Sequence, residues 1–375
     1  MSAAAWRKAM NTGAAAQAWG RPAGNPGAAT TAAAPAASAA ARFAHIRARH
    51  VLVLAALVAY PFVASPFFTF QIAAQAMLLG LVALSLMFLA GYGGMVSLSQ
   101  MTVAGIAGYA LAIFGTSATP EGVVLGWPWW LAIAIAIVVA TLAATLIGWL
   151  SVRTDGIYTI MITLAVGVAL YYLALQNYSV LAGFQGFQKV APPVLLGIDW
   201  RGPVPFYYLT LALSLAGYFA VKYVARAPFG LALQGIRDNP RRMEALGFDV
   251  TVHRIAAHAF AGVIAAVGGV LLVWYNGLIT PASIATNNLI NILIIAVIGG
   301  MRHPIGPFLG ALVFVLLQNF AIDLVNRERF NLVIGTGFLL IVLFSPDGLL
   351  GLWSRLKARL GRGAAGLTPV RRGGA

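Results

Sequence analysis

Several residue types on which enzymes depend are scarce or absent in this chain. There is no cysteine, which excludes disulfides, thiol chemistry and cysteine-ligated metal sites. Charged residues make up only 9% of the sequence, whereas soluble domains carry roughly 25%. Hydrophobic residues make up 61%. This balance predicts an integral membrane protein.

Acidic residues are equally scarce, with nine in the whole chain. No carboxylate pair is placed to hold Mg²⁺, and the five histidines lack an HExxH-type ligand spacing. An ion-coupled carrier keeps ionisable groups in its membrane interior, and here His258 and Asp323 are the only candidates for that role. These two residues leave a secondary carrier open as an alternative, although His258 fits a hydrogen-bonded packing role better.

A nucleotide-binding motif is also missing. None of the four lysines follows a glycine as the Walker A motif requires, so the chain cannot bind ATP by that route. We therefore expect a transport protein that is not an enzyme, that needs no cofactor and that draws its energy from elsewhere. The net charge of +15 could suggest nucleic acid, but the basic residues lie at span ends rather than in one basic domain. Membrane lipid, and not nucleic acid, is the expected partner of these charges.

Apolar runs near the length of a bilayer span, about 20 residues, recur along the chain. They predict an all-α fold, a polytopic transmembrane helical bundle of about ten spans, with eight to eleven possible. The eighth run is short, and the second and third are separated only by a polar and glycine-rich stretch. The expected spans are 51–69, 71–90, 101–118, 129–150, 157–177, 206–224, 254–275, 287–301, 305–325 and 331–348.

Charge placement predicts the orientation. With both termini cytoplasmic, 20 of the 24 lysines and arginines fall on the cytoplasmic side, as the positive-inside rule requires. We expect a disordered cytoplasmic tail at 1–41, a permease domain at 42–350 and a basic cytoplasmic tail at 351–375. Within the domain, residues 225–253 form a cytoplasmic loop. The segment 181–205 is expected to be a loop on the outer rim.

The cytoplasmic loop contains the longest polar insert, FGLALQGIRDNPRRMEALG at 229–247. Asn239 is a good helix N-cap, and Pro240 suits the first helical position. Gly247 suits the left-handed residue that ends a helix. A short capped helix with an apolar side and arginines around it suits docking into a groove on another protein. An ordinary solvated loop is the alternative.

Small and polar residues interrupt the apolar sequence in two places, between the second and third spans and at the start of the eighth. Broken backbone at membrane depth is tolerated only beside protein or a water-filled path, and broken helices aim N–H groups at anionic solutes. We therefore predict a translocation path, although small residues can also simply let helices approach closely. The candidate path residues are Gly94, Ser97, Ser99, Gln100, Thr163, Asn287, Asn288 and Asn291.

Four blocks in order carry a resemblance to a known family. Together they resemble the permease subunit of branched-chain amino acid ABC transporters, the LivM-type group, over most of the chain from about Leu78 to Pro346. The blocks are GYGGMVSLSQMTVAGIAGY at 91–109, VRTDGIYTIMITLA at 152–165, FGLALQGIRDNPRRMEALGFDV at 229–250 and VIGGMRHPIGPFLGALV at 297–313.

The resemblance implies an importer permease in the bacterial cytoplasmic (inner) membrane, with the segment 237–247 as the coupling helix. It implies three kinds of protein partner: ATP-binding cassette ATPase subunits, a second permease and an extracytoplasmic solute-binding protein. The solute would be a branched-chain or related amino acid, with urea, amides or another small solute as alternatives. The implied ATPase-coupling residues are Arg237, Asp238, Asn239, Arg241, Arg242, Glu244 and Gly247.

This chain departs from the family pattern at positions in the expected path. Ser99-Gln100 replaces the family's Gly-His, and Val103 replaces the phenylalanine that follows. Arg302-His303 is added in the fourth block. These departures leave the choice of solute open.

Overall fold

The computed structural model describes residues 52–119, 122–154, 156–193, 197, 199–324, 335–336, 339 and 348–351, with no side-chain description for 321–324. The chain divides into two units, Met1–Leu57 and Val58–Ala375. In the first unit residues 52–57 are described, and they are helical. The expected tail 1–41, all of the expected tail 351–375 except its first residue, most of the expected span 331–348 and the side chain of Asp323 lie outside the described residues.

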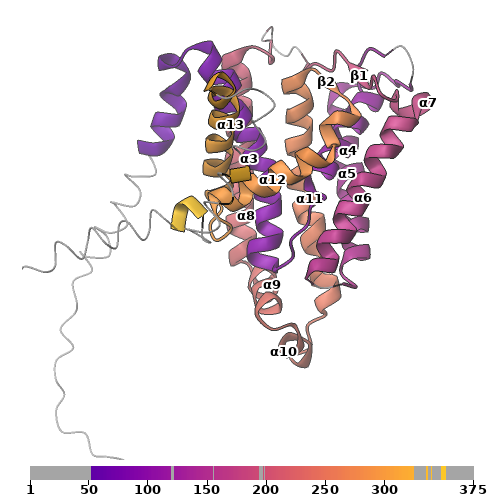
Figure 1. Ribbon diagram of the computed structural model, residues 1–375, viewed down its shortest axis with the longest axis vertical. Helices are drawn as coiled ribbons and strands as arrows, with labels where there is room; N and C mark the ends of the chain where they lie inside the picture. Colours follow the sequence, from indigo (N-terminus) through magenta and orange to yellow (C-terminus); the bar gives the residue numbers. More distant parts are fainter. Residues whose placement is uncertain are drawn as a thin grey trace, which may run out of the picture. The chain divides into compact units, whose positions relative to one another are not determined.

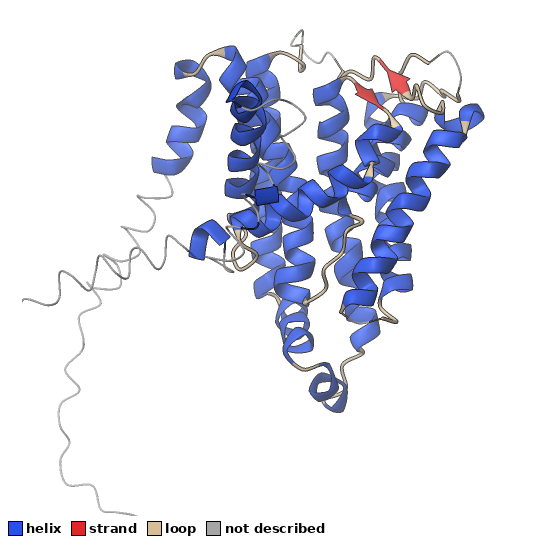
Figure 2. Cartoon of the chain, in the orientation of Figure 1, coloured by secondary structure: helices blue, strands red, loops and turns tan. Residues whose placement is uncertain are grey.

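The second unit is built almost entirely of helices (Figures 1 and 2). Two short strands, β1 (Phe187–Gln188) and β2 (Leu278–Ile279), pair antiparallel. The helices are η1 (Phe68–Ala74), α3 (Gln75–Met87), η2 (Phe88–Tyr92), α4 (Gln100–Phe114), α5 (Trp129–Ser151), α6 (Ile157–Gln176), α7 (Tyr178–Leu181), α8 (Pro203–Arg226), α9 (Pro228–Asp238), α10 (Pro240–Ala245), α11 (Val250–Asn276), η3 (Pro281–Ile284), α12 (Thr286–Gly299) and α13 (Gly306–Leu324).

Five helical stretches in the described residues are long and apolar enough to cross a membrane. They are Phe68–Tyr92, in which η1, α3 and η2 run on without a break, and α5, α6, α8 and α11. The helices α4 and α12 are apolar but shorter than a span. The prediction of an all-α membrane protein is confirmed.

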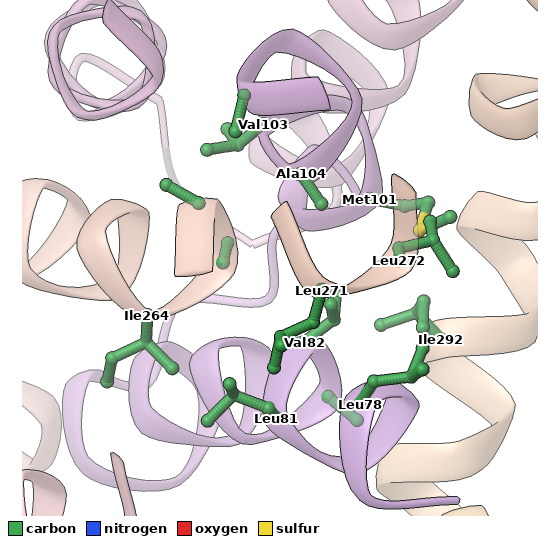
Figure 3. Packing of buried hydrophobic residues seen from close by; sticks show 14 of the residues in the cluster. Leu78, Leu81, Val82, Met101, Val103, Ala104, Ile264, Leu271, Leu272 and Ile292 are labelled. Atoms are coloured by element: carbon green, nitrogen blue, oxygen red, sulfur yellow. The ribbon is translucent and has the colours of Figure 1, made fainter. Parts of the chain in front are cut away.

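The core forms where α11 packs against α3, α4 and α5. Side chains of α3, α4 and α11 interdigitate there, with Ile292 of α12 beside them (Figure 3). The approach of α11 to α4 is so close that a Cβ at Gly269 would lie 2.0 Å from the carbonyl oxygen of Ala104. Helix α5 presents a stripe of buried alanines to this core, whereas Leu142 and Leu146 on its other side are exposed. Small residues on the packed side and large apolar ones outside are the pattern of a membrane helix.

Several expected boundaries are wrong. The first break falls at Ser65-Pro66 rather than near residue 70, because a residue that precedes proline is driven out of the helical conformation. Helix α11 begins at Val250 instead of 254, since the Asp249 carboxylate caps it by accepting from Val252 N at 3.0 Å. The expected span 101–118 stops at Phe114.

The ends of the helices in this unit differ in character. Figure 1 shows β1, β2 and α7 at one end and α10 at the other, which we call the α10 end. The expected outer loop at 181–205 begins at the last residue of α7, contains β1 and ends in the first turn of α8, and Gln188 also bridges to Ala118. At the α10 end the loop contains a helix that was not expected, α9, which begins at Pro228.

Candidate functional site

The backbone between η2 and α4 leaves the helical conformation at residues 94–97 and turns at 98–99. Gly94 has a φ of +68°, which an L side chain rarely adopts. Ser97 and Ser99 are almost completely buried, so this non-helical segment runs through protein (Figure 2). Irregular backbone at membrane depth is tolerated only in such surroundings. The prediction of a broken helix here is confirmed.

Hydrogen bonds connect the polar groups of the broken segment. The hydroxyls of Ser97 and Ser99 are 2.9 Å apart. The backbone N–H of Leu98 donates to Thr163 Oγ1 on α6 at 3.1 Å. Gln100 Oε1 accepts from the hydroxyl of Ser85 on α3 at 2.9 Å. The structure therefore brings four of the candidate path residues, Ser97, Ser99, Gln100 and Thr163, into one buried polar set.

Ser85 was missed by the sequence reasoning. Ser85 is a single hydroxyl residue in an apolar run. From the sequence alone, a serine that bonds to another helix cannot be distinguished from one that bonds to its own helix backbone. The single hydrogen of the Ser85 hydroxyl is shared between the carbonyl oxygen of Val82 at 2.6 Å and Gln100 Oε1 at 2.9 Å. Because Ser85 is completely buried, it ties α3 to the start of α4 through Gln100.

The asparagines of α12 lie apart from this set. Asn288 Nδ2 donates to the carbonyl of Ala282 at 2.9 Å, which fixes the turn η3. Asn287 is exposed and Asn291 is half-buried. Among the described residues, no hydrogen bond connects these three side chains to the broken segment. A role for them in the path remains a prediction.

At the α10 end, α9 and α10 form an arm with two different helices. Ala232, Leu233 and Ile236 bury one side of α9. Helix α10 has no buried residue, and Arg241, Arg242 and Glu244 are exposed. The arm is thus anchored through α9 and free to contact a partner through α10.

The capping of α10 follows the sequence prediction. Asn239 Oδ1 accepts from Arg242 N at 3.0 Å, and Pro240 occupies the first helical turn. Gly247 has a φ of +89°, and its N–H donates to the carbonyl of Glu244 at 2.9 Å. Both predicted ends of this helix are confirmed.

Arg237, at the end of α9, contacts the beginning of the broken segment. Its Nη1 donates to the carbonyl oxygen of Gly91 at 2.5 Å, and its Nε and Nη2 donate to Asp238 Oδ1 at 3.0 and 2.9 Å. The stem of the same side chain covers Gly94, where a Cβ would lie 2.5 Å from Arg237 Cγ. Arg237 therefore connects the arm to the backbone on which the path residues depend. We call this the Arg237 contact.

A cavity of about 270 Å³ lies beside the broken segment. Gly94, a predicted path residue, and Val96 line it on one side. Its other polar lining residues, among them Ser151, Thr154, Arg254 and His258, were not predicted as path residues. His258 Nδ1 lies 3.0 Å from the carbonyl oxygen of Arg254, so the hydrogen-bonded packing role expected for this histidine is confirmed.

The added Arg302-His303 pair lies in the turn between α12 and α13, where both side chains are exposed. Ile305 N donates to His303 Nδ1 at 3.3 Å. Protein atoms that displace part of the water around the ring lower the pKa of His303, and the positive charge of Lys222 on α8 lowers it further. The neutral ring is therefore the favoured form in this turn.

An all-α bundle with long apolar helices, a broken helix and a protruding polar arm defines a membrane permease. Residues 68–343 match the model of the family described as branched-chain amino acid transport system / permease component, and the chain belongs to this family. It is a permease subunit of an ABC importer and a multi-pass protein of the bacterial inner membrane, in a family whose members are transport subunits.

Curated relatives agree with the family. The chain is 25% identical over 320 residues to the high-affinity branched-chain amino acid transport system permease protein LivM of Escherichia coli, covering 79% of this chain and 73% of the relative. A probable LivM of Methanocaldococcus jannaschii is 23% identical over 58% of this chain and 67% of its own length. The nucleoside ABC transporter permease NupC of Lactococcus lactis is 27% identical over 61% of this chain and 74% of its own length. No solved structure matches the chain.

Proposed function

We propose that this chain forms, together with a second permease, the translocation path for branched-chain or related amino acids in an ABC importer. Separate ATPase subunits drive it by docking onto the arm of α9 and α10, and an extracytoplasmic protein delivers the solute. In this proposal the chain crosses the membrane about ten times, both termini are cytoplasmic, and residues 225–253 form the cytoplasmic coupling loop within a permease domain at 42–350.

The Arg237 contact carries this proposal. Helix α10 exposes its charges for a partner, while α9 is packed into the bundle. A movement imposed on the arm reaches Gly91 and Gly94 through Arg237, because its guanidinium and its stem touch these two residues directly. Closure of the ATPases on ATP would then shift the start of the broken segment by a rigid-body movement.

The buried polar set supports a small, polar or zwitterionic solute. Its side chains are hydroxyls and an amide, which can hydrogen bond to a solute without adding a charge to the membrane interior. Two LivM relatives are named as branched-chain amino acid permeases, and one relative as a nucleoside permease. A nucleoside is therefore the second candidate solute, beside urea and amides.

Transport by the reconstituted complex tests the proposal. The permease is incorporated into proteoliposomes with its ATPases, the second permease and the binding protein, and ATP-dependent uptake of radiolabelled leucine is measured. Competition by unlabelled isoleucine, valine, urea and adenosine ranks the solutes, and we expect isoleucine and valine to compete best. Uptake by the purified chain alone, driven by a pH gradient without ATP, would contradict the proposal in favour of an ion-coupled carrier.

A further inference from the structure

The last turns of α8 carry basic and aromatic side chains on one face. Tyr218, Lys222 and Arg226 are spaced four residues apart, so they lie along the same side of the helix. Lys222 is half-buried, and its Nζ lies 5.6 Å from the centre of the Tyr218 ring. Arg226, the last residue of α8, is exposed. An aromatic ring followed by basic groups is the pattern of a membrane span where it reaches the lipid headgroups.

The end of η2 lies beside this face of α8. Gly217 of α8 packs on α3, where a Cβ would lie 2.5 Å from Leu81 Cδ1. From this contact α8 continues to α9, and α3 continues through η2 to the Arg237 contact, so both run towards the α10 end. Arg226 and Tyr92 therefore reach the same level. The phenol of Tyr92 accordingly lies within electrostatic reach of Arg226 and Tyr218.

The turn between α12 and α13 adds a third basic side chain. The turn packs directly on the end of η2, because a Cβ at Gly91 would collide with the carbonyl oxygen of Met301. His303 in this turn is exposed. The charge of Lys222 lowers the pKa of His303, as expected for two side chains that lie near each other. We call Lys222, Arg226 and His303 the basic cluster.

The basic cluster presents hydrogen-bond donors. The ammonium of Lys222 and the guanidinium of Arg226 can only donate. Because the N–H of Ile305 donates to His303 Nδ1 at 3.3 Å, the hydrogen of the neutral ring lies on Nε2, which is a donor as well. Among the described residues, no carboxylate forms an ion pair with Lys222 or Arg226. Donors with an uncompensated positive charge suit a ligand whose charged oxygens accept, such as a phosphate group.

The surroundings of the basic cluster favour a lipid over a soluble anion. Helix α8 is long and apolar enough to cross the membrane. Phe219 and Tyr223, the neighbours of Tyr218 and Lys222 in the chain, are 55% and 78% exposed. Large exposed side chains of this kind on a membrane span are suited to contact acyl chains. Basic pockets between membrane helices bind the headgroups of anionic lipids.

We propose that the basic cluster is a binding site for an anionic phospholipid, such as phosphatidylglycerol. Its phosphate oxygens accept from Lys222, Arg226 and His303 Nε2, and its acyl chains lie along Phe219 and Tyr223. The assignment to the inner leaflet rests on the proposed function, which places the α10 end in the cytoplasm. The binding itself depends only on the cluster and on the apolar surface beside it.

Photolabelling tests the site. The complete complex in phosphatidylcholine nanodiscs receives increasing amounts of a photoactivatable phosphatidylglycerol, and the labelled peptides of this chain are identified by mass spectrometry. We expect label at the end of α8 and in the turn between α12 and α13, with competition by unlabelled phosphatidylglycerol but not by inorganic phosphate. Lys222→Gln and Arg226→Gln should each raise the lipid fraction for half-maximal labelling there about fivefold, whereas Lys222→Arg should not. Arg153→Gln removes a basic residue that lies over Trp149 at the end of α5, and this control should leave labelling of the cluster unchanged.

A further variant keeps the test decisive if a glutamine variant misfolds, which thermal unfolding in phosphatidylcholine nanodiscs would reveal. His303→Glu places a carboxylate near Lys222 in an exposed turn and should abolish the preference for phosphatidylglycerol over a phosphatidylcholine probe. Equal labelling of the wild-type cluster by both probes, competition by inorganic phosphate, or unchanged labelling in the folded variants would overturn the site. Labelling needs no transport, so the two proposals fail separately. Leucine uptake without labelling refutes only this site, whereas labelling without uptake refutes only the proposed function.

Discussion

The broken segment and helix α10 are both polar parts of a mostly apolar protein, but the polar groups of the first are buried and those of the second are exposed. Around the broken segment, Ser97, Gln100 and Thr163 are buried and hydrogen bonded within the chain, Ser97 to Ser99 in the same segment. On α10, Arg241 and Glu244 are exposed. The first region is complete within the subunit, whereas the second is suited to a partner.

The difference has a physical basis. A buried polar group without a partner costs about 1–3 kcal/mol, so the hydrogen bonds of the broken segment select one backbone path among many. Exposed charges cost little, and a six-residue helix has little packing of its own. Helix α10 can therefore move at little cost. The backbone of the broken segment changes its conformation only when several of its hydrogen bonds change together. The Arg237 contact joins the movable region to the rigid one.

The largest effect is expected when the charges of helix α10 are reversed. In the reconstituted complex, Arg241→Glu combined with Glu244→Lys should weaken ATPase docking on the order of tenfold or more, because like charges would then face each other. Substrate-stimulated ATP hydrolysis should fall accordingly, while the thermal unfolding of the permease stays the same. Lys189→Glu, an exposed reversal at the opposite end, is the matched control. Normal stimulation in the double variant would contradict docking through α10.

The second test separates docking from transmission. Arg237→Lys keeps a positive charge but loses the planar fork that contacts Gly91 and Asp238 together. We expect ATP hydrolysis to continue and leucine uptake per ATP to fall several-fold, since the arm no longer moves the broken segment. Asp238→Asn keeps the contact with Gly91 and should lower the ratio less. If both variants transport at the wild-type ratio, the Arg237 contact is not the connection.

The sequence was informative where one residue decides the local structure. Asn239, Pro240 and Gly247 predicted both ends of α10, because caps act over three or four positions. The broken segment was also predictable, because several glycines and polar residues close together interrupt the apolar sequence between two spans. The partners of these groups could not be predicted. The bonds from Leu98 to Thr163 and from Arg237 to Gly91 cross 65 and 146 positions, and only the packing of whole helices determines them.

A smaller effect is expected when the hydrogen bond between Ser85 and Gln100, beside the broken segment, is removed. Ser85→Ala removes the donor to Gln100 and leaves a buried acceptor unsatisfied, at a cost of about 1–3 kcal/mol. Thermal unfolding in detergent should shift down by a few degrees, about 2–4 °C per kcal/mol for a protein of moderate size. Ser179→Ala, at an exposed site on α7, is the matched control. Gln100→Leu added to Ser85→Ala should recover part of the loss, because neither side of the bond then remains polar. A double variant less stable than the sum of the singles would show that Gln100 has another essential partner.

The smallest expected effect concerns the stability of α10 itself. Asn239→Ala removes the cap that accepts from Arg242 N, which costs about 1 kcal/mol of helix stability. Asn239→Asp keeps an acceptor and should cost almost nothing. Hydrogen exchange at the Arg242 amide should accelerate about fivefold in the alanine variant of the isolated permease, because the free energy of local opening falls by that amount. Once the ATPases are bound the difference should shrink, since a docked helix no longer depends on its own cap. Equal acceleration in the free permease and in the complex would mean that α10 is not held by a partner, and the contrast with the broken segment would then lose its functional meaning.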